Sequence, residues 1–374
     1  MQNIEQDKRF MRAAINLSSK AVGVTNENPA VGAIITKFID GQDVIIGKGV
    51  TSKTGRPHAE QNALENVITT GYTSNNIKGA TLYVTLEPCS HYGRTPPCAE
   101  AIIKSGIKRV VIALKDIDSR VCGKGIEMLT NAGITTELGL LQAEAYNVQS
   151  TYFINKLYNR SFVTLKLALG KNNVIGSKII SKFSISNNLS KQISHDLRRC
   201  YDAILIGVNT AIIDNPMLTC RIDEVENHKL VRIVLDSNLR INLDSNLVKT
   251  AKHQELIIIC SPVVNIEKKE LLKNKGVKIF EIDDIYDIKN ILGLLYENNI
   301  HSVLVEGGAQ IAKSFINSGY VDKFALFNSC ATIDKEPIYA PFLNISKNYR
   351  KIEEMQLQNN MFTQWIRVEQ CLLA

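Results

Sequence analysis

The sequence lacks the long apolar run that a membrane-spanning helix requires. No stretch of the 374-residue chain approaches the roughly 18 consecutive apolar residues of such a helix. Its first residues, MQNIEQDKRFMRAAINLSSK, are polar where a secretory signal peptide is apolar. They predict instead an amphipathic helix near residues 5–22, with Phe10, Ala14 and Leu17 on one face. We therefore expect a cytoplasmic protein that has no membrane partner.

A compact disulfide framework is also absent. The eight cysteines are widely scattered, and a chain of this length needs no disulfide bond in order to fold. Six of them are expected to be small, buried apolar side chains: Cys122, Cys200, Cys220, Cys260, Cys330 and Cys371. The formal charge of +7 would suit an anionic ligand or nucleic acid, but lysines on solvated helix faces explain it more simply.

The length and the order of the predicted elements indicate two α/β domains. The chain is longer than a single hydrophobic core comfortably supports. Predicted strands and helices alternate in both halves, without a repeat of solenoid period. Residues 144–160 are polar and aromatic, and we expect a boundary helix and a linker there. The predicted domains are residues 1–146 and residues 147–374, the second with a mostly parallel sheet.

Four residues of the first half are of the types that a catalytic zinc site uses. His58 and Glu60 are followed further along the chain by Cys89 and Cys98. Three protein ligands leave the fourth tetrahedral position of zinc to a water molecule, whose pKa the metal lowers. A carboxylate that does not bind the metal can move protons between this water and a leaving amine. The sequence therefore predicts that His58, Cys89 and Cys98 bind Zn²⁺ and that Glu60 is catalytic.

A closed, structural zinc site is the alternative. It would need a fourth protein ligand, for which His91 is the only nearby candidate, and it would leave Glu60 without a role. Residues 90–97 (SHYGRTPP) make the gap between the two cysteines longer than the C-x-x-C spacing of the general zinc-deaminase signature. A glycine and two prolines allow this insert to loop out, so Cys98 can still return to the metal beside Cys89.

The motifs of the first half resemble a known family. They are NENPAVGAII, HAEQNAL and TLEPCSHYGRTPPC, and they are similar to those of the bacterial bifunctional riboflavin-biosynthesis enzymes. In that family a pyrimidine deaminase is fused to a reductase, and the deaminase signature has this long cysteine spacing. The resemblance implies a cytidine-deaminase-like α/β/α fold with zinc ligands and a proton shuttle at the four residues named above. Asn28 falls where related deaminases hold the pyrimidine, although an asparagine before proline also serves as a structural turn.

The second half lacks the G-x-G-x-x-G fingerprint of dinucleotide-binding proteins. Two strand–loop–helix junctions, residues 203–210 and residues 303–309, are better candidates for a phosphate site. Their glycines would let backbone amides approach an anion at the N-terminus of a helix. Glycines in such loops also serve merely as turns, so these residues alone leave both interpretations open.

Further motifs, HDLRRCYDAILIGVNTAIIDNPMLTCRI and VRIVLDSNLR, resemble the reductase domain of the same family. The resemblance implies a dihydrofolate-reductase-like α/β fold that binds NADPH. The implied dinucleotide contacts are Ala168, Ser184, Thr210, Asp214, Ser237, Gly308, Ala309, Gln310, Ile311, Ala312, Lys313 and Ser314. The implied substrate contacts are Arg198, Leu218, Arg221 and Glu306. Arginine suits this role because its guanidinium group can hold a sugar phosphate through two hydrogen bonds.

The second half departs from the family pattern in two segments. Residues 166–173 (KLALGKNN) stand where the family usually has K-x-A-x-S-L-D-G, so an asparagine replaces the aspartate. Residues 182–186 (KFSIS) stand where a serine and a Trp-Ile-Thr stretch are usual. Both segments would lie where substrate and nicotinamide meet, so a deaminase that carries an inactive reductase domain stays an alternative.

The leading hypothesis is an enzyme of riboflavin biosynthesis with a phosphorylated pyrimidine as its small-molecule substrate. It would deaminate 2,5-diamino-6-ribosylamino-4(3H)-pyrimidinone 5′-phosphate and then reduce the ribosyl group with NADPH to give 5-amino-6-(5-phosphoribitylamino)uracil. A nucleic-acid deaminase is less favoured, because it needs no second β/α domain and normally has the short cysteine spacing. A non-enzymatic zinc module leaves Glu60 unexplained. We expect no nucleic-acid partner and, since family members assemble through the reductase domain, a homo-oligomer.

Overall fold

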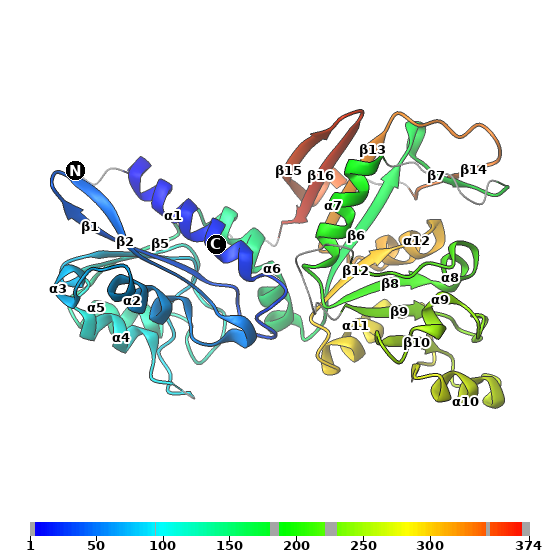
Figure 1. Cartoon of the computed structure of the whole chain (residues 1–374), viewed down its shortest axis with the longest axis horizontal. Coiled ribbons are helices and arrows are strands. Elements are labelled where there is room, and N and C mark those ends of the chain that lie inside the picture. The colour runs from blue at the N-terminus through cyan, green and yellow to red at the C-terminus, as the bar shows by residue number, and fades with distance from the viewer. Residues whose placement is uncertain (1–3, 94, 180–186, 221–229, 342–344, 369–374) are drawn as a thin grey trace. The chain divides into compact units, whose positions relative to one another are not determined.

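The computed structural model describes residues 4–93, 95–179, 187–220, 230–341 and 345–368. It divides into two compact units, Met1–Tyr158 and Asn159–Ala374 (Figure 1). The division between the units falls after the continuous helix α6 (Gln142–Tyr158), whereas the sequence predicts it between residues 146 and 147, inside this helix. The later turns of this helix belong to the first unit. Gln149 donates a hydrogen bond to the Ala30 carbonyl, and Tyr152 donates one to Asp116.

The first unit is built on a five-stranded sheet with the order β2-β1-β3-β4-β5. Its strands are β1 (Gly32–Ile39), β2 (Gln42–Val50), β3 (Thr81–Val84), β4 (Arg109–Ile112) and β5 (Thr135–Leu138). β1 is antiparallel to β2 and β3, and β3, β4 and β5 are parallel. The strands of this half therefore form one mixed sheet, as an α/β domain requires.

Helices cover both faces of this sheet. They are α1 (Ile4–Ser18), α2 (Ala59–Thr69), α3 (Ser74–Ile77), α4 (Cys98–Ser105), α5 (Lys124–Asn131) and α6. α4 packs beside α2 and α5, and α1 packs beside α6, so the unit has the α/β/α layers expected (Figure 1). Glycine sets the distance between α2 and the hairpin, because a Cβ at Gly49 would lie only 2.0 Å from the carbonyl oxygen of Ala59. The first turn of α2 is thus held directly against β2.

The second unit contains a nine-stranded sheet with the order β11-β10-β9-β8-β12-β6-β13-β16-β15. Its strands are β6 (Phe162–Leu169), β8 (Ala203–Gly207), β9 (Val231–Leu235), β10 (Leu256–Cys260), β11 (Lys278–Glu281), β12 (Ser302–Glu306), β13 (Lys323–Ser329), β15 (Tyr349–Leu357) and β16 (Asn360–Arg367). The pairings from β11 to β13 are parallel, and β16 runs antiparallel to both β13 and β15. β7 (Val174–Ser177) and β14 (Pro337–Tyr339) form a separate two-stranded sheet. The mostly parallel sheet predicted for this half is confirmed.

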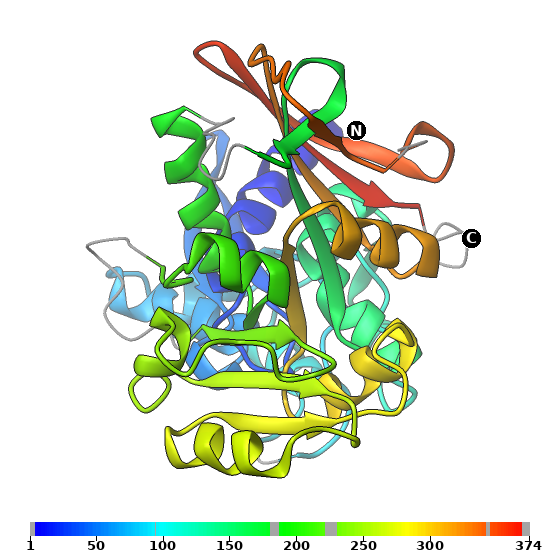
Figure 2. The same ribbon diagram turned by 90° about the vertical axis from the view of Figure 1, so that its right-hand side faces the viewer.

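Apolar side chains fill both faces of the parallel part of this sheet. Its helices are α7 (Asn188–Arg198), α8 (Val208–Asp214), α9 (Asn246–Lys249), α10 (Ile266–Asn274), α11 (Ile288–Glu297) and α12 (Ala309–Ser318). Successive residues of a strand point to opposite faces. Leu205 accordingly packs with residues of α11 and α12, whereas Ile204 and Ile206 pack with residues of α8, α9 and α10. The ribbon views show how these helices lie along the sheet (Figures 1 and 2). Within the described ranges, no helix is long and apolar enough to cross a membrane.

The expectation that the cysteines outside the zinc motif are buried is wrong for most of them. Cys260 is buried in β10, as expected. Four others lie in loops and turns, which run over the surface, and are exposed or half-buried: Cys122, Cys200, Cys220 and Cys330. Cys371 lies outside the described residues.

Candidate active sites

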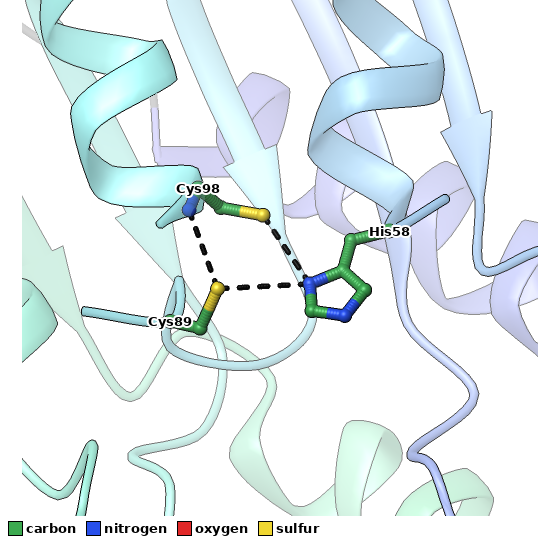
Figure 3. A group of neighbouring side chains, drawn as sticks. All are labelled: His58, Cys89 and Cys98. Carbon is green, nitrogen blue, oxygen red and sulfur yellow. Dashed lines mark hydrogen bonds between the residues drawn. The ribbon is translucent and has the colours of Figure 1, made fainter. Parts of the chain in front are cut away.

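Three metal-donor side chains converge in the first unit, as the sequence predicts. His58 immediately precedes α2, Cys89 lies in the loop after β3, and Cys98 is the first residue of α4. Nδ1 of His58 lies 3.3 Å from Sγ of Cys98 and 3.6 Å from Sγ of Cys89 (Figure 3). The three donor atoms lie within 4.8 Å of one another. No further histidine, cysteine or carboxylate of the described residues joins this cluster, so His91 is not a fourth ligand.

The cluster fits a tetrahedral zinc ion. Zn–N bonds of about 2.0–2.1 Å and Zn–S bonds of about 2.3 Å hold the nitrogen and sulfur donors about 3.5 Å apart. The two N···S distances, 3.3 and 3.6 Å, agree with this separation. A hydrogen bond with Cys98 lowers the pKa of Cys89 to about 4, and the same bond raises the pKa of Cys98. One thiol is therefore poised as a thiolate, and a divalent cation would allow both to ionise.

The N-terminus of α4 holds Cys89 in place. The backbone N–H of Cys98 donates to Sγ of Cys89 at 3.2 Å, and the N–H of Ala99 donates to the Cys89 carbonyl at 3.1 Å. These are amides of the first turn, which have no partner inside the helix and which favour a negative charge. The helix that begins at Cys98 thus binds the other cysteine through backbone donors of its own first turn.

Glu60 lies in the first turn of α2 and is 4% exposed. It lines a cavity of about 210 Å³ together with His58, Cys89 and His91. Burial raises the pKa of Glu60 to about 7. A carboxyl group beside an open metal-donor cluster and inside a cavity is the arrangement that proton transfer to a bound substrate requires.

Asn28 also lines this cavity, but its amide already has structural partners. Its side-chain nitrogen donates to the carbonyls of Thr25 and Thr54 at 3.3 and 3.4 Å. Both interpretations of Asn28 therefore have support, since it fixes the loop and faces the pocket. Its contact with a pyrimidine stays a prediction.

A second cavity, of about 590 Å³, lies in the second unit at the carboxyl ends of β8, β9 and β12. β8 pairs with β9 on one side and with β12 on the other, so the strand order reverses here, and such a point is where open α/β sheets bind ligands. Predicted dinucleotide residues that line this cavity are Thr210, Asp214, Ser237, Gly308, Ala309, Gln310, Ile311 and Ser314.

The remaining predicted dinucleotide residues do not line this cavity. Ala312 is fully buried in the hydrophobic core between the sheet and α12, so its side chain faces away. Ala168 packs against a small apolar cluster around Phe327, and Lys313 is exposed on α12. Ser184 lies outside the described residues.

The predicted substrate residues Arg198 and Glu306 form an ion pair at the end of β12. Nε and Nη2 of Arg198 donate to the two carboxylate oxygens of Glu306 at 3.0 and 3.1 Å. Burial raises the pKa of Glu306, but Lys166, 3.8 Å away, and Arg198 outweigh it and lower the pKa overall. Nη1 of Arg198 donates to the Thr219 carbonyl, next to the buried Leu218. Arg221 lies outside the described part of the chain.

Comparison with known proteins agrees with both sites. The family model of the cytidine and deoxycytidylate deaminase zinc-binding region matches residues 4–114, and that of the RibD C-terminal domain matches residues 175–341. The riboflavin biosynthesis protein RibD of Aquifex aeolicus is 40% identical over 86% of either chain. RibD of Bacillus amyloliquefaciens is 36% identical over 86% of this chain and 84% of its own. This chain belongs to the RibD family.

Solved structures extend the likeness to nearly the whole chain. A diaminohydroxyphosphoribosylaminopyrimidine deaminase/5-amino-6-(5-phosphoribosylamino)uracil reductase from Thermotoga maritima matches with a TM-score of 0.82 and 30% identity. The match covers 98% of this chain and 100% of that one. RibD from Acinetobacter baumannii matches with a TM-score of 0.80 and 28% identity, at the same coverage. The predicted family, fold class and bifunctional deaminase–reductase activity in riboflavin biosynthesis are therefore confirmed.

Two residues of this RibD-family chain escaped the sequence analysis. Glu87 is buried, and its carboxylate accepts hydrogen bonds from the backbone N–H groups of Asp116, Gly123, Gly125 and Ile126. Arg240 is the only cationic side chain among the described residues that line the second cavity. Its guanidinium donates to Asn209 and could also hold a nucleotide phosphate. Two local features of the sequence could have pointed to these residues. Glu87 directly precedes Pro88 and Cys89, and Arg240 is the last residue of the motif VRIVLDSNLR.

Proposed function

We propose that the first cavity removes the 2-amino group of 2,5-diamino-6-ribosylamino-4(3H)-pyrimidinone 5′-phosphate by hydrolysis. The observation that carries this proposal is the buried carboxyl of Glu60 on the wall of the cavity that two of the three metal donors, His58 and Cys89, also line. In the reaction, the oxygen of water bonds to the ring carbon, and the amino group leaves as ammonia. The RibD relationship supplies the identity of the substrate.

The residues of this cavity suit the separate tasks of the reaction. His58, Cys89 and Cys98 would hold Zn²⁺, which when bound supplies a Lewis acid that lowers the pKa of water. Glu60 would accept a proton of the water and deliver it to the ring nitrogen and then to the departing amine. Asn28 would hold the pyrimidine ring at the wall of the cavity. The carboxyl of Glu60 is shielded from solvent, so the proton it holds does not leak to bulk water.

We propose further that the second cavity binds NADPH and that this unit reduces the ribosyl group of the deaminated product. NADPH when bound would supply the hydride for C1′, and with a proton from solvent the sugar would open into a ribityl chain, giving 5-amino-6-(5-phosphoribitylamino)uracil and NADP⁺. Thr210, Ser237 and the turn at residues 308–311 would contact the dinucleotide. Arg198 and Glu306 would contact the substrate.

The alternative of an inactive reductase unit rests on the segment at residues 170–173, which departs from the family pattern, but the backbone there suits the residues present. Asn172 and Asn173 both have φ 61°, in the left-handed region that asparagine adopts more readily than most residues. The turn is therefore compatible with the residues that this chain has. The other departure, at residues 182–186, includes no described residue.

One experiment separates these possibilities. The diaminopyrimidine ribotide is supplied with NADPH, and ammonia release and NADPH oxidation are followed separately. Both signals are expected. Ammonia without NADPH oxidation would leave only the deaminase, and the absence of both would contradict the proposed function.

Assembly and location are proposals of the same kind. We propose a homo-oligomer in the cytoplasm, on the basis of the RibD relationship. Light scattering coupled to size-exclusion chromatography measures the assembly, and a mass equal to that of one chain would contradict it. Cell fractionation measures the location.

A further inference from the structure

A short segment of the first unit, Glu87, Pro88 and Cys89, is bound by the N-termini of two helices. In the first turn of α4, the N–H groups of Cys98 and Ala99 donate to Sγ and to the carbonyl of Cys89. The first turn of α5 donates to the carboxylate of Glu87. Free N–H groups at the start of a helix favour a negative charge, so both contacts are favourable. The segment therefore fastens a metal donor and a buried carboxylate within three residues.

The carboxylate of Glu87 uses all of its acceptor positions. Oε1 accepts from the N–H groups of Gly125 and Ile126 at 3.0 and 3.2 Å. Oε2 accepts from those of Asp116 and Gly123 at 3.1 and 3.0 Å. A carboxylate offers about four acceptor sites, so these four donors match it. The side chain thus binds both the start of the loop between β4 and α5 and the helix that follows this loop.

The β4–α5 loop forms part of the wall of the deaminase cavity. Four of its residues line this cavity: Asp116, Asp118, Arg120 and Val121. The hydroxyl of Tyr152 donates to Oδ1 of Asp116 at 2.9 Å, so the side chain at the start of the loop is held as well as its backbone. Because Cys89 comes two residues after Glu87, the loop is fastened at a set distance from a metal donor.

The contact between α5 and the segment that carries Cys89 is too close to admit a side chain. A Cβ at Gly125 would lie 2.1 Å from the carbonyl oxygen of Pro88 and 3.2 Å from Oε1 of Glu87. Backbone therefore lies directly on backbone, and neither chain can adjust by turning a flexible side chain. A shift of Glu87 must move α5 and the loop before it.

We propose that Glu87 is a positioning residue of the deaminase. It holds the β4–α5 loop so that a pyrimidine bound against this wall lies within reach of the metal donors and of Glu60. Backbone amides occupy the oxygens of Glu87, so it acts on the substrate through the loop. This inference rests on the proposed deaminase function. A misplacement of about 1 Å can cost about 10²-fold in rate, so the loss of this support should lower kcat.

The test measures ammonia release per bound zinc ion in Glu87→Gln. The new amide presents N–H groups to N–H donors, so part of the network is lost and the loop should shift. Cys89 keeps its bonds to α4, so zinc should stay bound while kcat per zinc falls about 10- to 100-fold. KM should change less than kcat, because the side chains of the wall are retained. Glu127→Gln removes an exposed carboxylate from the first turn of α5 and, as the matched control, should release ammonia normally.

Two further variants examine the same contact. Gly125→Ala leaves Glu87 unchanged, but its methyl group meets the Pro88 carbonyl, so it should displace α5 and reproduce the fall in kcat per zinc. Glu87→Asp keeps the charge on a shorter side chain and should retain part of the rate. These variants decide the question if Glu87→Gln does not fold.

A role in folding alone would reduce the amount of zinc-loaded enzyme and leave kcat per zinc unchanged. Unchanged kcat per zinc in Glu87→Gln and in Gly125→Ala would therefore overturn the proposal. A loss of zinc that accounts for the whole fall in ammonia release would overturn it as well, because Glu87 would then support the metal donor and not the cavity wall. Failure of the unmodified, zinc-loaded enzyme to release ammonia would instead reject the deaminase function itself.

Discussion

At the scale of single residues, Glu60 has the clearest role to test. In Glu60→Gln the amide cannot accept the proton of water, so ammonia release should fall by about 10²–10⁴-fold while zinc stays bound. Cys89→Ala should instead lose the metal, because it removes one of three donors. Ammonia assays and elemental analysis distinguish the two outcomes. Glu65→Gln, an exposed position of the same helix, is the control, and near-normal turnover in Glu60→Gln would reject its role.

Asp7 makes the stability of the first unit depend on pH. Burial raises its pKa, but hydrogen bonds from Arg109 and Tyr83, at 2.5–2.9 Å, outweigh this and lower the pKa below its usual value. A carboxyl whose pKa is lower in the folded state stabilises above its unfolded pKa of about 3.9. This contribution is lost as the pH falls through the folded pKa.

Asp7→Asn should therefore destabilise the first unit at neutral pH by about 1–3 kcal/mol, the cost of an unsatisfied buried partner. Arg109 keeps its ion pair with Glu137, which limits the loss. Calorimetry at pH 7 and near pH 3 measures the loss of stability. The difference in unfolding free energy between Asp7→Asn and the unmodified protein should shrink at the lower pH. A difference that does not change with pH would contradict the assignment.

At the scale of elements, the contact between α2 and β2 determines where the metal donor His58 lies. Gly49→Ala would place a methyl group 2.0 Å from the Ala59 carbonyl, so the start of α2 must move. We expect a loss of about 1–3 kcal/mol in stability and weaker zinc retention against a chelator. Gly293→Ala is the control, since a Cβ there meets nothing within 4 Å. Unchanged zinc retention in Gly49→Ala would show that α2 tolerates the shift.

The elements around the metal donors could be predicted from the sequence because their signals are local. Two prolines precede the helix that begins at Cys98, and Pro57 precedes His58. The domain boundary could not be predicted, since the polar residues of α6 that suggested a linker are buried: Gln149, Ser150 and Asn155. The hydrogen bonds of Glu87 were equally hidden, because its partners lie on another loop far along the chain.

One arginine in each cavity illustrates a second limit of the sequence. Arg56 and Arg240 resemble any other arginine in the chain until their neighbours are known. Whether an arginine can bind an anionic ligand depends on whether a carboxylate already neutralises it, and tertiary packing decides which arginines are neutralised. The family resemblance implied eight of the residues that line the second cavity, but it did not imply a role for either of these guanidinium groups.

At the scale of the whole molecule, each cavity is lined by residues of one unit alone. Arg198→Gln should therefore reduce NADPH oxidation and leave ammonia release intact. The variant loses a charged partner of the half-buried Glu306, so hydride transfer should fall about 10- to 100-fold. Coupled assays with the ribotide measure both activities. Arg199→Gln, the next residue after α7, is the control, and a parallel loss of ammonia release would contradict the independence of the units.

Glu87 should couple the binding of the metal to the binding of the substrate. It immediately precedes Pro88 and Cys89, and its carboxylate fastens the segment that carries Asp116 on the cavity wall. A metal that immobilises Cys89 would therefore also reduce the freedom of the segment that carries Asp116, so less entropy would be lost when the pyrimidine binds. By reciprocity, a bound pyrimidine should tighten the binding of zinc. Starvation for substrate would then be the condition under which this enzyme most readily loses its metal.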